Sequence, residues 1–134
     1  MSRHLLVAMD DSEPARTALN YALSAFPESK VTVVHVVDDL EAGYGGGPTA
    51  EAARDQDEPA FFADVRRLAE GHAGDVALEV LEGTPVDAIL EYVRSNDVDG
   101  VVVGSEGRSG VSRMLLGSVA EGVARRVEVP VTIV

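Results

Sequence analysis

Short apolar runs alternate along this chain with segments in which apolar residues recur every three or four positions. The runs have the length of strands buried on both faces, whereas the periodic segments have the spacing of helices that bury one face. This alternation predicts an α/β fold in which helices cross over between the strands of a parallel sheet. The apolar runs lie at 5–9, 31–37, 76–81, 100–104 and 129–134, and the helical segments at 14–26, 58–70, 85–96 and 118–127.

The order of the segments predicts an open, doubly wound sheet of five parallel strands with helices on both faces, because crossovers between parallel strands are right-handed. The run at 76–81 contains Glu79 and is therefore expected at an edge of the sheet, while the unbroken run at 100–104 is expected near its centre. The 134 residues suffice for one domain, 1–134, and are too few for two of ordinary size.

Ligands of such sheets bind at the carboxyl ends of the strands, at the point where the winding reverses. We therefore expect a site just after the runs at 5–9, 31–37 and 100–104. Near this point Asp11 or Ser12 is expected to cap the first helix.

Composition excludes several classes of function. The chain has no Cys, which excludes a disulfide framework, a thiolate metal site and a Cys nucleophile. No apolar run approaches the ~20 residues of a membrane span, and Asp10 interrupts the N-terminal run too early for a signal peptide. We therefore expect a cytoplasmic protein with no membrane partner. His4, His35 and His72 lack the spacing of metal ligands, and His35 is expected to be a packed, hydrogen-bonded strand residue.

The net charge of −12 argues against nucleic acid as a partner. Residues 1–100 contain 7 basic and 20 acidic side chains, whereas residues 101–134 contain 4 and 3, so an anion meets least repulsion in the last segment. The basic residues are ten Arg and one Lys. A surface poor in Lys and rich in carboxylates suits concentrated salt, where the Debye length is about 3 Å near 1 M. We hypothesise a halophilic, salt-accumulating host; a merely acidic protein is the alternative.

The glycine-rich segment at 104–118 is the strongest candidate for a functional site. Glycine lets the backbone approach a phosphate chain closely. A helix N-terminus adds free N–H groups and a partial positive charge, and an Arg adds a guanidinium. The residues that would supply these groups are Gly104, Gly107, Arg108 (or Arg113), Gly117 and Ser118.

The same segment also has a purely structural interpretation. Ser118 and Glu121 form the capping-box pattern that starts a helix. Gly104 is then a residue that ends a strand, and Gly110 a turn residue. The neutral local charge in an otherwise acidic chain favours the anion site.

Other phosphate-binding and catalytic patterns are absent from the sequence. There is no G-x4-G-K-(S/T) of a P-loop, no G-x-G-x2-G of a dinucleotide fold and no G-x-S-x-G nucleophile elbow. The acidic pair Asp10 and Asp11 resembles that of response-regulator receivers. However, 81–83 offers no phosphoacceptor Asp, and the last strand has no Lys at its end.

The spacing Gly104-x2-Gly107-x9-Gly117-Ser118 resembles the G-x2-G-x9-G-(S/T) motif of the universal stress protein family. Segments 9–14, 34–37 and 83–85 resemble other landmarks of that family, and the resemblance covers essentially the whole chain. The chain departs from the family at Asp11, where a Gly is expected, and this adds negative charge near the pocket.

The resemblance implies a strand order of 3-2-1-4-5 and an ATP site, with AMP or ADP as other candidates for the working ligand. By position, Asp10 would hold the nucleoside through its ribose, and Val36 would contact the adenine. The alternatives are a helix cap for Asp10 and a core position for Val36. The ribose and phosphates, with Mg²⁺ or Mn²⁺ shared by the phosphate chain, would be held by Gly104, Gly107, Gly117 and Ser118.

The last apolar run offers an open strand edge, which is a pairing hazard unless something pairs with it. The resemblance implies a homodimer in which the twofold mate pairs there, through Val131 to Val134. Burial within one chain is the alternative.

These observations lead to the hypothesis of an ATP-binding universal stress protein that acts as a nucleotide-dependent sensor or regulator. Catalysis is expected to be slow or absent, because no general base is evident near the phosphates. One alternative is a protein-interaction module of the same fold with an empty pocket. Another is a slow ATPase, in which Asp10, Asp11 or Glu106 serves as base or metal ligand.

Overall fold

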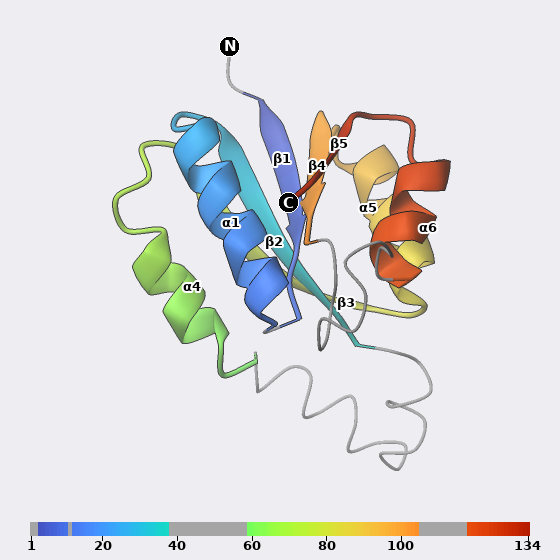
Figure 1. The fold of residues 1–134 in the computed structure, drawn as a ribbon, viewed down its shortest axis with the longest axis horizontal. Helices are drawn as coiled ribbons and strands as arrows, with labels where there is room; N and C mark the ends of the chain where they lie inside the picture. Colours follow the sequence, from blue (N-terminus) through green and yellow to red (C-terminus); the bar gives the residue numbers. More distant parts are fainter. Residues whose placement is uncertain (1–2, 11, 38–58, 105–117) are drawn as a thin grey trace.

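Residues 3–10, 12–37, 59–104 and 118–134 are described in the computed structural model. They form strands and helices in strict alternation (Figure 1), as the sequence predicts. The strands are β1 (His4–Ala8), β2 (Lys30–Val37), β3 (Val76–Glu82), β4 (Gly100–Val103) and β5 (Val131–Ile133). The helices are α1 (Glu13–Ala25), α4 (Phe62–Leu68), α5 (Pro85–Ser95) and α6 (Ser118–Arg126). None of the helices within these ranges is long and apolar enough to cross a bilayer.

The five strands form one parallel sheet in the order β3-β2-β1-β4-β5, which confirms the predicted order. The winding reverses between β1 and β4, because the chain moves from β1 to β2 and β3 on one side and then returns to the other. Strand β4 is internal and its residues are buried, while β3 is an edge strand with Glu79 exposed. Both placements agree with the sequence pattern.

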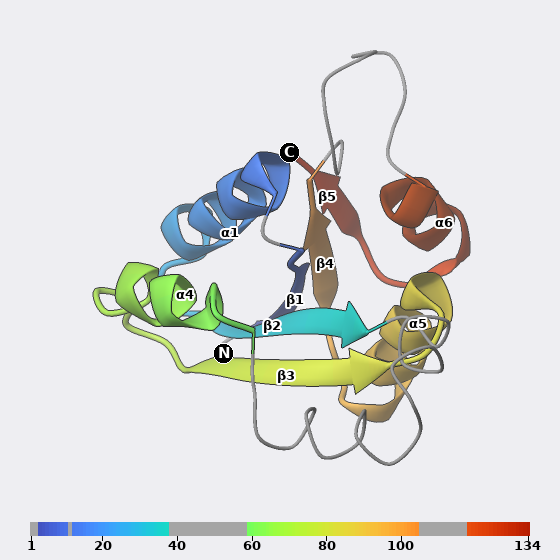
Figure 2. The same cartoon turned by 90° about the horizontal axis from the view of Figure 1, so that it is seen from below.

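Helices cover both faces of the sheet (Figure 2). On one face α1 and α4 bury Leu19 and Phe62 against Leu5 and Val7 of β1. On the other face α5 and α6 pack against Leu6 and its neighbours. Strand β1 thus buries successive side chains in opposite layers, which explains why its sequence is an unbroken apolar run.

The ends of two helices show how local sequence sets their bounds. Helix α1 begins after Ser12, whose Oγ accepts the Ala15 N–H at 3.2 Å, and it stops at Ala25, two residues before Pro27. Helix α4 is shorter than the expected 58–70, because the residues before Phe62 form turns, with its N–H donating to the Pro59 carbonyl at 3.0 Å.

The amino ends of the strands are joined by side-chain hydrogen bonds. The His4 ring lies 3.2 Å from the Asn96 carbonyl through Nδ1 and 2.8 Å from the hydroxyl of buried Thr32 through Nε2. Because a carbonyl only accepts, Nδ1 carries the proton and Nε2 accepts from Thr32. Burial, and then the positive charge of Lys30, lower the pKa of His4 below its ordinary 6.5. The His4 backbone N–H donates to the Asp99 carboxylate at 2.9 Å.

A second junction at the same end joins the turn after α1 to the turn before β3. His72 Nε2 donates to the Ser29 carbonyl at 2.7 Å, and Gly74 lies so close to that carbonyl that a side chain would not fit. The loops at the amino end are therefore fixed to each other by hydrogen bonds and close packing.

Candidate functional site

The structure brings three of the predicted site residues to neighbouring positions at the carboxyl edge of the sheet. Ala8 of β1 is the register partner of Val34 in β2, so Asp10 and Val36 each lie two residues beyond this pair. Val7 is the register partner of Val102 in β4, so Gly104 is level with Met9, one residue before Asp10. Neighbouring parallel strands lie about 4.8 Å apart. These three residues therefore end adjacent strands at the point where the winding reverses.

Asp10 is exposed, and its carboxylate uses one oxygen to stabilise the turn before α1. The Ser12 N–H donates to Asp10 Oδ1 at 3.1 Å, while Ser12 itself is the N-cap of the helix. The alternative of Asp10 as the helix cap is therefore wrong. An exposed carboxylate with a second oxygen accepts hydrogen bonds readily, and hydroxyl groups of a sugar are suitable donors.

Val36 is half-buried and packs at the margin of the core between the sheet and the α5/α6 layer. Its register partner on the outer side is Leu81 of β3. The part of the side chain that remains accessible lies at the same level as Asp10, so an apolar surface and a hydrogen-bond acceptor adjoin at this end of the sheet. Such pairs suit a ligand with one flat apolar part and one hydroxylated part.

Gly104 has a structural reason to be glycine that the sequence did not reveal. A Cβ at this position would lie 2.6 Å from the carbonyl carbon of Pro14 and 2.7 Å from its oxygen. The end of β4 thus packs directly against the first turn of α1, and no side chain fits between them. The contact shows that Gly104 does more than end a strand, and whether it also approaches phosphate stays a prediction.

Three of the remaining predicted residues of the glycine motif fall outside the structural description, and the fourth begins α6. Gly107, Arg108 and Gly117 lie outside the described residues, and so does Arg113. Ser118 is the first residue of α6, and its side chain is likewise outside the description.

The position of α6 is set by its packing on α5. A Cβ on Gly122 would lie 2.7 Å from Val86 Cγ2, so the two helices approach closely at this point. One turn further on, Arg126 donates to Asp87 at 3.0 Å across the same interface. These two contacts hold the helix whose N-terminus the glycine motif precedes.

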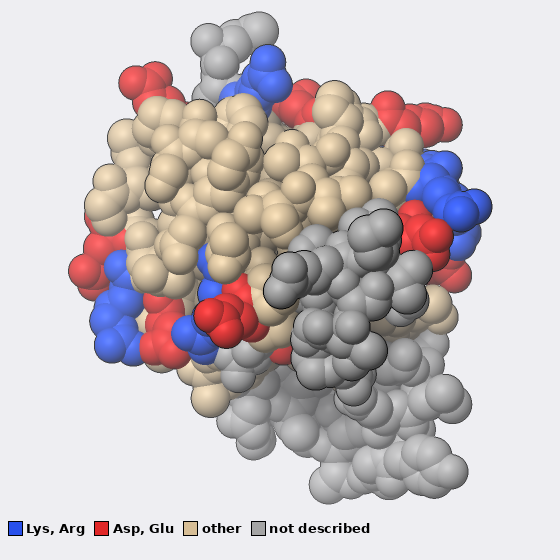
Figure 3. Space-filling view, viewed as in Figure 1, with Lys and Arg blue, Asp and Glu red and all other residues tan. Residues whose placement is uncertain are grey.

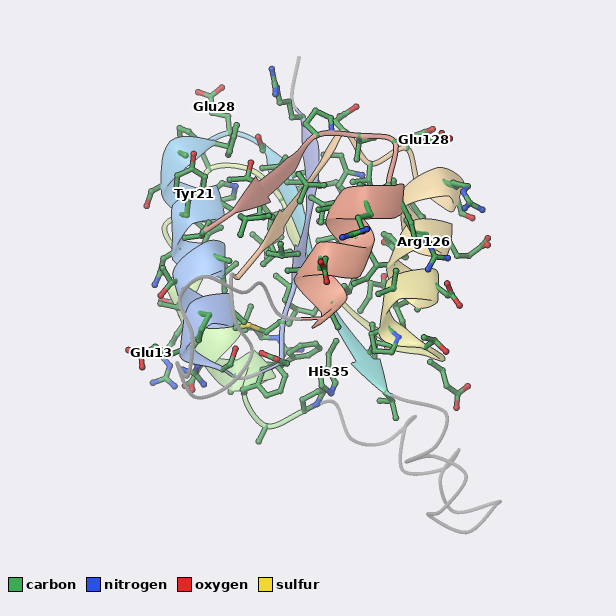
Figure 4. The ribbon with its side chains drawn as sticks, turned by 45° about the vertical axis from the view of Figure 1, so that its right-hand side comes forward. Glu13, Tyr21, Glu28, His35, Arg126 and Glu128 are labelled. Carbon is green, nitrogen blue, oxygen red and sulfur yellow. The ribbon has the colours of Figure 1, made fainter. Side chains whose placement is uncertain are left out.

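His35 takes part in the architecture of the site through the backbone. Its Nδ1 donates to the Met9 carbonyl at 3.0 Å, which fixes the residue just before Asp10. The ring also packs edge-on against Phe61, with centroids 5.2 Å apart. Figure 4 shows His35 at the same end of the molecule as Glu13, opposite Glu28. His35 is therefore the packed, hydrogen-bonded strand residue that the sequence predicts.

The described part of the site carries negative charge. Asp10 and Glu13 are exposed carboxylates, and the nearby Arg16 pairs with Asp64 of α4 at 3.3 Å. This environment disfavours a phosphate beside Asp10. Among the residues that the structure describes, no group of three or more His, Asp or Glu side chains is arranged to hold a metal ion.

Comparison with known proteins identifies the family. The model of the universal stress protein family matches residues 1–134. A universal stress protein of Methanocaldococcus jannaschii is 29% identical over 139 residues, spanning 98% of this chain and 81% of that protein. The solved structure of a second such protein from the same organism has a TM-score of 0.82 at 25% identity, covering 100% of this chain and 96% of that one. A universal stress protein solved in complex with cAMP has a TM-score of 0.66 at 27% identity, covering 98% and 95%. With its whole described length matched in sequence and in fold, the chain belongs to the universal stress protein family.

Proposed function

We propose that this protein binds an adenine nucleotide at the carboxyl ends of β2, β1 and β4 and acts as a nucleotide-dependent sensor or regulator in the cytoplasm. The observation that carries the proposal is that Asp10 and Val36 lie at one level, with Gly104 level with the preceding Met9, at the carboxyl ends of three adjacent strands around the reversal point of the sheet. The relative solved in complex with cAMP supports an adenine nucleotide as the ligand class.

The charges suggest how the ligand would divide between the two parts of the site. The exposed Asp10 carboxylate would accept a ribose hydroxyl, and the accessible part of Val36 would contact the base. The phosphates would extend away from Asp10, toward the N-terminus of α6, because like charges repel. There the motif residues Gly107, Arg108, Gly117 and Ser118 would bind them, with Mg²⁺ or Mn²⁺ held by phosphate oxygens.

ATP is the proposed ligand, and AMP and ADP are the competing ones. A slow or absent hydrolysis remains our expectation, because turnover needs a base that positions water in line with the terminal phosphate. The bound nucleotide would then act through its occupancy of the site, with the protein changing its affinity for a partner when the ligand is exchanged.

We also propose a homodimer joined through β5. The Val101 N–H donates to the Pro130 carbonyl and the Val134 N–H to the Val103 carbonyl, both at 2.9 Å. Backbone groups alternate in direction along a parallel strand, so Val131 and Ile133 direct theirs away from β4. Ile133 is 39% exposed, and β5 contains no charged residue. A twofold mate could extend the sheet along this edge.

The acidic composition supports the further proposal of a high-salt environment. The net charge is −12, and the basic residues include only one Lys. Unfolding in dilute buffer and refolding in ~1 M KCl, where repulsion is screened, is the expected behaviour. Equal stability in both buffers would contradict it.

The nucleotide proposal is tested by calorimetric titration of nucleotide-free protein with MgATP, AMP and cAMP in ~1 M KCl. We expect binding of roughly micromolar strength at one site per chain. Gly117→Val would place a branched side chain where the phosphates approach, and it should abolish ATP binding while the dimer persists. Gly71→Val is the matched control, since an added Cβ there has no neighbour within 4 Å.

Three results would count against the proposal in different ways. Neither heat nor a thermal shift with any nucleotide would leave an interaction module of the same fold. Equal ATP affinity in Gly117→Val and wild type would mean that the glycine motif is only structural. Hydrolysis above about one turnover per minute would replace the sensor by a slow ATPase.

A further inference from the structure

The start of α1 has few backbone donors left for a phosphate. In doubly wound folds a phosphate commonly binds at the first turn from strand to helix, because the N–H groups of the helix start point outward there. Here the Ser12 N–H donates to Asp10 Oδ1 at 3.1 Å, and the Ala15 N–H donates to Ser12 Oγ at 3.2 Å. Pro14 has no N–H. Of the first three residues of the helix, at most Glu13 can therefore donate to an anion.

The neighbouring strands close the same turn from both sides. On the β2 side, the Met9 N–H donates to the Val34 carbonyl at 2.8 Å, so this donor is also used within the chain. On the β4 side, a Cβ on Gly104 would lie 2.6 Å from the carbonyl carbon of Pro14 and 2.7 Å from its oxygen. Even a methyl group would not fit between β4 and the start of α1, and a phosphate is larger.

The charges around the turn are also unfavourable to a phosphate. Asp10 and Glu13 are exposed carboxylates. The nearest basic residue along the chain, Arg16, pairs with Asp64 of α4 at 3.3 Å, and Arg67 pairs with the same carboxylate. Figure 3 shows acidic and basic side chains gathered over α4 and the start of α1, while the middle of this face is uncharged. A phosphate at the turn would therefore face carboxylates, and the two arginines are engaged with α4.

The turn suits an uncharged group that donates hydrogen bonds. The Asp10 carboxylate accepts the Ser12 N–H through Oδ1, and a carboxylate has about four acceptor sites in all. A free ribose hydroxyl can donate to the sites that remain. Once that hydroxyl is esterified by phosphate, it loses its hydrogen and gains a negative charge beside Asp10. A site that binds a hydroxyl by a hydrogen bond rejects an analogue that lacks it.

We propose that the turn at Asp10, Ser12 and Glu13 admits only the part of a nucleotide that carries free hydroxyl groups, so that the ligand has its phosphates on the 5′ oxygen alone. Nucleotides with phosphate on the 3′ oxygen, whether 3′-phosphorylated or 3′,5′-cyclic, are selected against. Asp10 is the residue that determines this specificity. The inference rests on the proposed nucleotide site and names the class of ligand that the site selects.

The test is calorimetric titration of nucleotide-free protein with AMP, adenosine 3′,5′-bisphosphate and cAMP in ~1 M KCl. AMP and the bisphosphate share the base, the sugar and the 5′ phosphate, and they differ only at the 3′ oxygen. We expect the bisphosphate and cAMP to bind roughly tenfold or more weakly than AMP. AMP without its 3′ hydroxyl loses the hydrogen bond and gains no charge, so its dissociation constant should lie between those of AMP and the bisphosphate.

Variants assign the selectivity to its residue through the ratio of the bisphosphate and AMP dissociation constants. Asp10→Asn removes the charge and keeps an acceptor oxygen for the Ser12 N–H, and it should lower this ratio roughly threefold or more. Glu28→Gln is the matched control, because Glu28 is an exposed carboxylate at the opposite end of the molecule from Glu13 (Figure 4), and it should leave the ratio unchanged. Glu13→Gln should also lower the ratio, and it decides the matter if Asp10→Asn does not fold.

The outcomes separate this inference from the proposed function. Equal dissociation constants of AMP and the bisphosphate in the wild type would overturn the inference and leave the nucleotide site in place. A ratio that stays at the wild-type value in Asp10→Asn would overturn the role of Asp10. Absence of binding by both AMP and ATP would refute the proposed function itself, and the inference with it.

Discussion

The two ends of the sheet are built differently. At the amino ends, side chains complete hydrogen bonds with neighbouring chain segments, as His4 does with Asn96 and Thr32. At the carboxyl ends, the Asp10 carboxylate is exposed and Val36 is only half-buried. At the amino end the ring of His4 is thus bonded within the chain through both nitrogens, and at the carboxyl end an acceptor and an apolar surface stay accessible to a ligand. Stability and binding are therefore expected to depend on different residues.

Gly104 is the position where we expect one substitution to lower both stability and nucleotide binding. In Gly104→Ala the new Cβ would lie 2.6 Å from the Pro14 carbonyl carbon, and backbone cannot move aside as a flexible side chain can. Overpacking of this kind costs about 1–3 kcal/mol, and we expect the upper end of that range in urea unfolding, together with weaker nucleotide binding. Gly71→Ala, with no neighbour near its Cβ, should stay within about 0.5 kcal/mol of wild type. A fully stable Gly104→Ala would refute the close contact of β4 with α1.

His4→Ala should lower stability without affecting the ligand. It removes the partner of the Thr32 hydroxyl, whose residue is fully buried, and an unsatisfied buried group costs about 1–3 kcal/mol. Nucleotide affinity should remain that of wild type. The double variant with Thr32→Val removes both partners, so it should recover part of the loss in unfolding free energy. No recovery would show that the hydrogen bond is not the cause.

Stability should fall when the pH is lowered through the ordinary pKa of histidine. Burial holds the pKa of His4 below 6.5 in the folded protein, so the unfolded chain binds the proton more readily. The contribution is fully present above pH ~6.5 and is lost as the pH falls from there toward the lower folded pKa. Unfolding of wild type and His4→Gln between pH ~7.5 and ~5.5 isolates this contribution from other histidines. Parallel pH profiles would contradict the prediction.

Asp10→Ala should show the smallest change in stability and a clear change in binding. Its carboxylate accepts the Ser12 N–H and is otherwise exposed among the described residues, so we expect a loss of less than about 0.5 kcal/mol in unfolding free energy. Loss of a ribose contact should weaken nucleotide binding roughly tenfold. Unchanged nucleotide affinity in Asp10→Ala would show that Asp10 does not contact the ligand. It would also contradict the proposed difference between the two ends of the sheet.

The fold could be predicted because each strand and each helix has its own local sequence pattern, and the two patterns alternate along the chain. Each strand is an apolar run of its own, and Glu79 alone identifies β3 as an edge strand. The start of α4 was placed too early, because the residues before Phe62 are compatible with a helix and become turns only through contacts made in the folded chain.

The site was predictable only in part. The glycine motif pointed to Gly104 and the family resemblance to Asp10 and Val36, and the sheet brings these residues to the carboxyl ends of adjacent strands. The packing of Gly104 on Pro14 joins residues 90 positions apart, and no local pattern carries such information. The bond of His4 to Thr32 was missed for the same reason, since a histidine at the start of a strand has no distinguishing sequence signal.

The carboxylates of β3 have a consequence for how far assembly can proceed. A pair joined at β5 would expose a β3 strand at each end of the combined sheet. Each of these strands carries Glu79 and Glu82, so a third copy adding edge to edge would meet a row of negative charge. Edge-to-edge assembly would then stop at two chains. The charged β3 edge would keep a protein that pairs through β5 from forming fibres.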